Sequence, residues 1–256
     1  AGPAVGVVVG LVMVGKDLGT ALIFVLLVAG ALFVAGVPMR IFTVLAVVTA
    51  GLVAIAASTS NRAGRIFAIF GGETADPSGI GYQTQRGLEA LGSGGFAGVG
   101  LGASREKWSY LPEAHNDFIF AVIGEELGLL GTLLVLLLFA ILGIAMVRII
   151  RRHPEPMVKI TTAAIGCWII GQALINIGVV IGLVPVIGVP LPLVSAGGSA
   201  LIATMLALGI VISFARDEPG AREALAARSS VVRRSIAVVG GATWRRGGRP
   251  TTSDDK

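Results

Sequence analysis

Long runs of apolar residues dominate the chain, and polar residues gather in short stretches between them. Six runs are candidates to cross the ~30 Å hydrocarbon core of a membrane as helices, at about 1.5 Å per residue. They cover Ala1–Gly15, Leu18–Val37, Ile41–Ala57, Phe118–Met146, Ile160–Val184 and Leu201–Phe214. The pattern predicts six crossings, of which the first is partial and the last is short.

Composition excludes a soluble protein. Hydrophobic residues make up 54% of the chain, charged residues only 14%, and the mean hydropathy is +0.87. Soluble globular domains carry roughly 25% charged residues. A single cysteine, Cys167, rules out an intramolecular disulfide and a cysteine-based metal site.

Lysine and arginine in short loops give the expected orientation, because they concentrate on the cytoplasmic side. If the crossings alternate, the basic stretches fall on one side. They are Arg40, the loop with Arg148, Arg151, Arg152 and Lys159, and the segment from Arg216 to Arg249. We expect residues 1–216 to form a transmembrane domain whose long loop 58–117 lies outside. Residues 217–256 are expected to form a disordered cytoplasmic tail that binds anionic lipid head groups rather than nucleic acid.

Asp117 stands where the long polar loop ends and an apolar run begins. One interpretation is structural: Asn116 and Asp117 cap a helix, which stabilises it by about 0.5–2 kcal/mol. The other is chemical, because a carboxylate, cations and aromatic rings crowd together at the membrane surface. These neighbours are Lys107, Trp108, Tyr110, Glu113 and His115. The residues alone leave both interpretations open.

Glu125 and Glu126 follow within the apolar run. In a continuous helix Glu125 would lie about 12 Å below Asp117, inside the hydrocarbon. A carboxyl group at that depth either marks a functional site with a cation, a polar cavity or a proton, or pairs with a neighbouring helix to fix the bundle. The sequence does not separate these alternatives.

Gln172 and Asn176 are four residues apart and share one helix face, where hydrogen bonding between helices is the favoured interpretation. The stretch Gly182–Ser199 follows, with three prolines and four glycines, and cannot continue the helix. Such backbone is tolerated at membrane depth only where protein covers it or where it lines a wet cavity. We therefore expect a broken or re-entrant segment beside a substrate cleft.

Other common sites are not indicated. His115 and His153 are expected on opposite membrane faces, so they cannot form one zinc site. The sequence contains neither a Walker A pattern nor a nucleophile elbow. Any chemistry must draw its energy from the substrate.

Several motifs resemble the SEDS family, which contains FtsW and RodA. They are Asp17–Thr20, Gly98–Gly102, Leu111–Gly128, Gln172 with Asn176, and Leu191–Ser199. The run Lys107–His115 and the arginine-rich tail resemble the FtsW branch more than the RodA branch. Because the chain starts at Ala1 inside an apolar run, we expect it to be cut from a longer protein.

The resemblance implies an all-α polytopic membrane bundle of ten spans, of which this chain keeps about six. It also implies an inverting glycosyltransferase that polymerises lipid II during septal cell-wall synthesis at the bacterial inner membrane. Asp117 matches the family's proposed catalytic carboxylate and would take the proton of the acceptor hydroxyl. The supporting residues would be Lys107, Glu113, His115, Glu125 and Glu126. The substrate-binding residues would be Arg62, Arg65, Gln172, Asn176, Pro192, Ser195, Gly197, Gly198 and Ser199.

No nucleotide is needed, because lipid II is already an activated diphosphate ester. Arg62, Arg65 and Lys107, or a divalent cation such as Mg²⁺ or Mn²⁺, would neutralise the diphosphate. The expected partners are an FtsI-like class B penicillin-binding protein and other divisome proteins. Two alternatives remain, a lipid II flippase that uses Glu125 and Glu126, and a division scaffold that recruits the penicillin-binding protein.

Overall fold

The computed structural model describes residues 18–58, 80–104, 116–218 and 220, and every regular element in these ranges is an α-helix. The helices are α2 (Leu18–Val34), α3 (Met39–Ser58), α5 (Ile80–Ser93), α6 (Ile119–Arg152), α7 (Pro156–Val180) and α8 (Gly198–Arg216). The predicted all-α fold is confirmed. The first predicted span and the tail beyond residue 220 lie outside the described residues, as do Arg62, Arg65, Lys107, Glu113 and His115.

Three described helices, α6, α7 and α8, are long and apolar enough to cross a membrane. The apolar parts of α2 (Gly19–Val34) and of α3 (Met39–Gly51) are shorter. The chain therefore has the helices of a multi-pass membrane protein. By its internal contacts it divides into residues 1–211 and 212–256, and the boundary falls inside α8.

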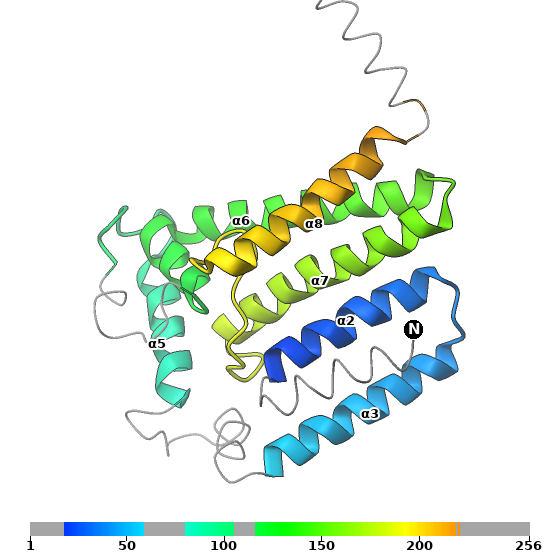
Figure 1. Ribbon diagram of the computed structural model, residues 1–256. Coiled ribbons are helices and arrows are strands. Elements are labelled where there is room, and N and C mark those ends of the chain that lie inside the picture. Colours follow the sequence, from blue (N-terminus) through cyan, green and yellow to red (C-terminus); the bar gives the residue numbers. More distant parts are fainter. Residues whose placement is uncertain (1–17, 59–79, 105–115, 219, 221–256) are drawn as a thin grey trace, which may run out of the picture. The chain divides into compact units, whose positions relative to one another are not determined.

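Small residues let neighbouring helices approach closely within residues 1–211. Helix α2 packs along α7, which also contacts α6 (Figure 1). Gly30 of α2 faces Cys167 and the carbonyl of Ala163 on α7 so closely that a methyl group at Gly30 would overlap both. Close packing of small residues drives helix association in membranes, where lipid is as apolar as the side chains.

The helix α5 lies in the long loop, where the sequence analysis predicted no regular element. Its packed face includes the small residues Gly87 and Ala90 together with Leu91, which packs against the buried cluster. Ala90 is fully buried, and a methyl group at Gly87 would lie 3.0 Å from the Phe118 ring. The opposite side carries the exposed ion pair Arg86–Glu89, whose nearest atoms are 2.8 Å apart. The side of α5 that carries Gly87 and Ala90 therefore packs against the start of α6.

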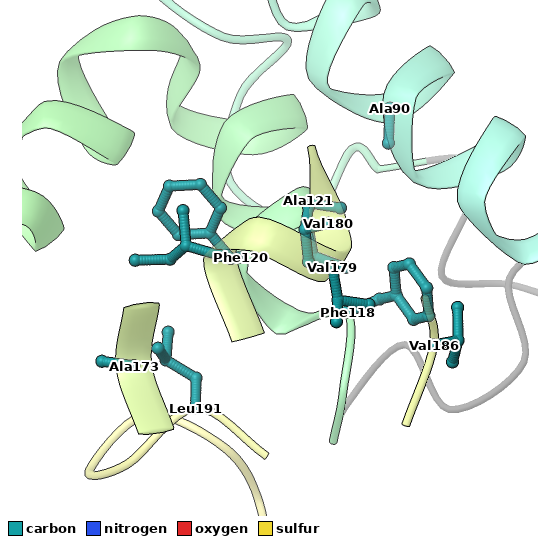
Figure 2. Close-up of a cluster of buried hydrophobic side chains, with 11 residues drawn as sticks. Ala90, Phe118, Phe120, Ala121, Ala173, Val179, Val180, Val186 and Leu191 are labelled. Carbon is teal, nitrogen blue, oxygen red and sulfur yellow. The ribbon is translucent and has the colours of Figure 1, made fainter. Parts of the chain in front are cut away.

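A buried apolar cluster lies directly beside Asp117. Figure 2 shows side chains from α5, from the start of α6, from α7 and from the segment that follows α7. Phe118 and Leu191 are each 1% exposed, and Val180 is fully buried. Burial of a large apolar side chain contributes about 1.5–3 kcal/mol. This cluster holds four parts of the chain together next to the candidate carboxylate.

Helix α6 is broken at Gly128, whose backbone (φ 66°, ψ −159°) is not helical. The prediction of one continuous helix across Phe118–Met146 is therefore wrong in this detail. The 34 residues of α6 would reach about 51 Å as a straight helix, whereas residues 129–152 alone reach about 36 Å, which suits a membrane. The break separates Glu125 from the long apolar part, so its predicted depth of 12 Å no longer follows.

The break after α7 was predicted from sequence and is confirmed. Helix α7 ends at Val180 rather than Val184, and residues 181–197 are irregular. Gly182 has φ +76°, and the amides of Leu183 and Val184 both donate to the carbonyl of Gly178. This left-handed turn stops the helix before Pro185. We call residues 181–197 the connecting segment.

Candidate active site at Asp117

Asp117 lies in a turn just before α6 and is half-buried. The N-cap position of α6 is occupied by Phe118, and the first helical turn contains no acidic residue. Asn116 and Asp117 therefore precede the cap position instead of filling it, which removes the main support for a capping role. The turn is held instead by side chains from α7 and the connecting segment.

Asn176 of α7 fixes the backbone of Asp117. Its side-chain amide nitrogen donates to the carbonyl of Asp117 and to the carbonyl of Val189, both at 2.7 Å. Asn176 is 1% exposed. One buried amide thus joins the start of α6 to the connecting segment, where hydrogen bonding between helices had been expected.

The side chains of Ser195 and Gln172 also fix the connecting segment through hydrogen bonds to backbone groups. Ser195 accepts a hydrogen bond from the amide of Leu191 and donates to the carbonyl of Asn116, both at 2.7 Å. Gln172 donates to the carbonyl of Pro190 at 2.8 Å and accepts from the Trp168 indole at 2.8 Å. Their known contacts are to protein groups, so Gln172, Asn176 and Ser195 act first on the shape of the site.

The carboxylate of Asp117 lies over an exposed part of the connecting segment. A methyl group added at Gly188 would lie 3.6 Å from Oδ2 of Asp117. Gly188 is exposed and has φ +69°, a conformation that glycine adopts without strain. Bare backbone therefore lies beside the carboxylate, which leaves room for a substrate group.

The remaining described residues of the predicted substrate-binding set lie at the end of the connecting segment and at the start of α8. Pro192 is buried, whereas Gly198 and Ser199 are exposed and Gly197 is half-buried. Leu193 has φ +65°, which is rare for a residue with a side chain. The bonds from Ser195 and Val194 to Leu191 hold the turn at Leu193 closed. Strain that surrounding bonds enforce is common at functional sites.

Glu125 and Glu126 belong to a neighbouring cluster. Glu125 is 3% exposed, and its Oε2 accepts a 2.6 Å hydrogen bond from the hydroxyl of Ser104, which is 2% exposed. Glu126 is half-buried, and its carbonyl accepts from the amide of Gly100. Glu125 thus binds the loop that follows α5, a partner that neither interpretation of the sequence had included.

Metal-binding side chains do not gather in the part of the chain that the structure describes. No group of three or more histidine, cysteine, aspartate or glutamate residues occurs within 18–58, 80–104 and 116–218. The predicted cluster before Asp117 lies entirely outside these ranges; it consists of Lys107, Trp108, Tyr110, Glu113 and His115.

The sequence profile of the FtsW/RodA/SpoVE family, described as "Cell cycle protein", matches residues 2–219. The chain belongs to this family. It is 44% identical over 226 residues to the "Probable peptidoglycan glycosyltransferase FtsW" of Mycobacterium tuberculosis, covering 88% of this chain and 43% of that protein. It is 39% identical over 218 residues to "Stage V sporulation protein E" of Bacillus subtilis, covering 84% of this chain and 59% of that protein.

A solved structure supports the same placement among FtsW/RodA/SpoVE proteins. It matches with a TM-score of 0.64 at 29% identity, over 82% of this chain and 59% of the solved chain. Its title is "Structural coordination of polymerization and crosslinking by a peptidoglycan synthase complex". The chain therefore spans about half the length of the relatives that it matches.

Three residues of this FtsW/RodA/SpoVE site were missing from the sequence prediction. Gly188 lies between predicted residues, but only the positive φ and the nearby carboxylate reveal its importance. Trp168 is four residues before Gln172 on the same helix face, a spacing that could have suggested the pair. Ser104 is 21 residues from Glu125, and no local signal connects them.

Proposed function

We propose that this chain is the C-terminal part of a peptidoglycan glycosyltransferase that polymerises lipid II, with Asp117 as the general base. The observation that carries the proposal is the position of the Asp117 carboxylate beside the exposed backbone of Gly188. Asn176 and Ser195 hold the turn that presents it. The family and the names of the relatives supply the reaction.

The proposed chemistry is a single displacement at the donor sugar. The acceptor 4-hydroxyl attacks the anomeric carbon, a new carbon–oxygen bond forms, and the bond to the diphosphate breaks. The proton of the hydroxyl moves to Asp117, and the polyprenyl diphosphate leaves with the electron pair. Inversion follows from attack opposite the leaving group. A positioned base contributes about 10²–10⁴-fold to such a step.

Gln172, Asn176 and Ser195 are proposed to position the site through its backbone rather than to bind the sugar. Gly188, Gly197, Gly198 and Ser199 are proposed to form the surface that the substrate meets. Arg62, Arg65 and Lys107 remain proposed partners of the diphosphate, alone or with a divalent cation. Glu113, His115, Glu125 and Glu126 are proposed to support this site.

The test is Asp117→Asn in the full-length protein, with its class B penicillin-binding protein present, assayed for glycan chains made from lipid II. We expect at least a 100-fold loss of rate, because asparagine has nearly the same shape but cannot take the proton. Glu89→Gln is the matched control, since it removes one negative charge from the exposed side of α5 and should keep full activity. Polymerisation by Asp117→Asn at the control rate would overturn the proposal.

The same variant separates the alternatives. A flippase that uses Glu125 and Glu126 would still translocate lipid in Asp117→Asn, whereas a polymerase would lose chain growth. If the protein is only a scaffold, Asp117→Asn should change neither chain growth nor lipid translocation, provided that the variant still binds its partner. Binding of Asp117→Asn to the penicillin-binding protein is expected to equal that of the unmodified protein.

We also propose the cellular setting. The loop 58–117 and the connecting segment would face the outside of the bacterial inner membrane, and the basic tail the cytoplasm, as the positive-inside rule requires. Arg151 and Arg152 at the end of α6 support this orientation. The protein would act at the division septum with an FtsI-like class B penicillin-binding protein. The peptidoglycan synthase complex named for the solved structure supports a partnership of this kind.

A further inference from the structure

The break in α6 is repaired by the loop that follows α5. In an unbroken helix the amides of Leu129 and Leu130 would donate to the carbonyls of Glu125 and Glu126. Instead, Leu129 donates to the carbonyl of Gly95 at 3.0 Å and Leu130 to that of Phe96 at 3.4 Å. The two freed carbonyls need donors from elsewhere.

The same loop supplies those donors. The carbonyl of Glu125 accepts from the amide of Val99 at 2.9 Å, and that of Glu126 from the amide of Gly100 at 3.1 Å. The two lost helical hydrogen bonds are therefore replaced by four bonds to residues 95–100. We call residues 94–102 the splice loop. The polar groups that the break frees in α6 are thus satisfied by protein.

The splice loop presents an apolar surface. Its sequence from Gly94 to Gly102 has no polar side chain. Phe96 is 68% exposed, Val99 47% and Leu101 81%. An exposed apolar surface of this kind marks an interaction site on a protein.

This surface continues the lipid-facing side of α6. Leu130, bonded through its backbone to Phe96, is 55% exposed, and Leu129 is 47% exposed. Further along α6, Leu133, Leu134 and Leu137 are each at least half exposed. Apolar side chains exposed on a membrane-crossing helix contact lipid, and the backbone bond from Leu130 to Phe96 joins the splice loop to this helix.

We propose that the splice loop lies at the surface of the outer leaflet, with its backbone among the lipid head groups and with the side chains of Phe96, Val99 and Leu101 reaching the acyl chains of the bilayer. The absence of polar side chains in its sequence and its backbone hydrogen bonds to the exposed start of the long part of α6 both fit this occupant. The helix α5 differs, because its exposed residues include Gln85 and Glu89, which would lie in water. The lipid contact is independent of the proposed catalytic role of Asp117.

Depth-dependent quenching tests this placement. The full-length protein, freed of its other cysteines, receives Leu101→Cys, is labelled with the environment-sensitive dye NBD and is reconstituted into phosphatidylcholine–phosphatidylglycerol vesicles. A share of the lipids carries a nitroxide quencher on the acyl chain. Leu137→Cys, exposed on α6, is the lipid-facing control, and Glu89→Cys on α5 is the water-facing control.

We expect quenching at Leu101 to approach that at Leu137 and to exceed that at Glu89 at least twofold. Phe96→Cys gives the same readout if the Leu101 variant does not fold. Equal quenching at Leu101 and Glu89 would overturn the inference. So would loss of the quenching when the penicillin-binding protein is added, because the surface would then bind protein rather than lipid.

Discussion

The side-chain amide of Asn176 donates to the backbone carbonyl of Asp117 at 2.7 Å, and to that of Val189 at the same distance. The oxygen of the same amide, Oδ1, is buried and has no hydrogen-bond partner in the described part of the chain. An unsatisfied buried oxygen costs about 1–3 kcal/mol. This cost falls on Asn176, the residue that joins the start of α6 to the connecting segment.

Asn176→Leu is expected to lower the rate of polymerisation at saturating lipid II about 10- to 100-fold with little change in KM. The leucine keeps the approximate volume but releases the Asp117 backbone, and small displacements of a reacting group are costly. Rates measured over a range of lipid II concentrations check this. Leu174→Ala, at an exposed position of the same helix, should leave both constants unchanged. An equal fall in both variants would contradict a positioning role for Asn176.

Gly188→Ala is expected to reduce activity strongly while changing stability only moderately. Its positive φ costs a residue with a side chain about 1–2 kcal/mol, and the methyl group would stand beside the Asp117 carboxylate. Gly36→Ala is the matched control, because Gly36 has φ +75° and nothing within 4 Å of an added methyl group. Thermal unfolding should show similar losses for both, and only Gly188→Ala should slow polymerisation. Similar activities would show that the space beside Asp117 is unimportant.

Ser104 and Glu125 should be energetically coupled. A typical hydrogen bond contributes about 0.5–1.5 kcal/mol, and this one joins residues that are almost fully buried. A double-mutant cycle with Ser104→Ala and Glu125→Gln is expected to give a coupling energy above about 1 kcal/mol from detergent unfolding curves. The exposed pair Arg86–Glu89 is the control and should give about 0–1 kcal/mol.

Labelling of single cysteines from each side of the membrane checks the proposed orientation. A thiol at position 89, in the long loop, should react with a membrane-impermeant maleimide added to intact spheroplasts. A thiol at position 155, between α6 and α7, should react only after the membrane is opened. Both Glu89 and Glu155 are exposed, so burial does not limit their reaction. The reverse labelling pattern would mean that the protein has the opposite orientation in the membrane.

The sequence was sufficient for the features that depend on local chemistry. Apolar runs predicted the described helices α2, α3, α6, α7 and α8 to within a few residues at most ends, because hydrophobic length is read along the chain. Prolines and glycines predicted the break after α7. The polar residues Gln172 and Asn176 were noticed because such side chains are rare in an apolar helix.

Features that depend on distant contacts were missed. The helix α5 packs against the Phe118 ring through Gly87, a contact between residues 31 positions apart that the sequence does not indicate. The bond of Asn176 to Asp117 joins residues 59 positions apart, which single-sequence periodicity cannot connect. The break at Gly128 was also missed, because the sequence of residues 124–128 is compatible with a helix. Only the backbone hydrogen bonds from the splice loop show that the helix is interrupted there.

Gly128→Ala should destabilise the protein much more than Gly143→Ala in the same helix. The backbone of Gly128 (φ 66°, ψ −159°) is nearly closed to other residues and costs them about 1–3 kcal/mol. Its methyl group would also collide with the amide nitrogen of Gly98 and the carbonyl of Phe96. At Gly143 the nearest atoms, on Ile170, would be 3.8 Å away, and alanine favours the helix by up to about 1 kcal/mol. Thermal unfolding of the full-length protein in detergent should therefore show a large loss for the first variant and none for the second; equal unfolding temperatures would mean that the helix is not broken at Gly128.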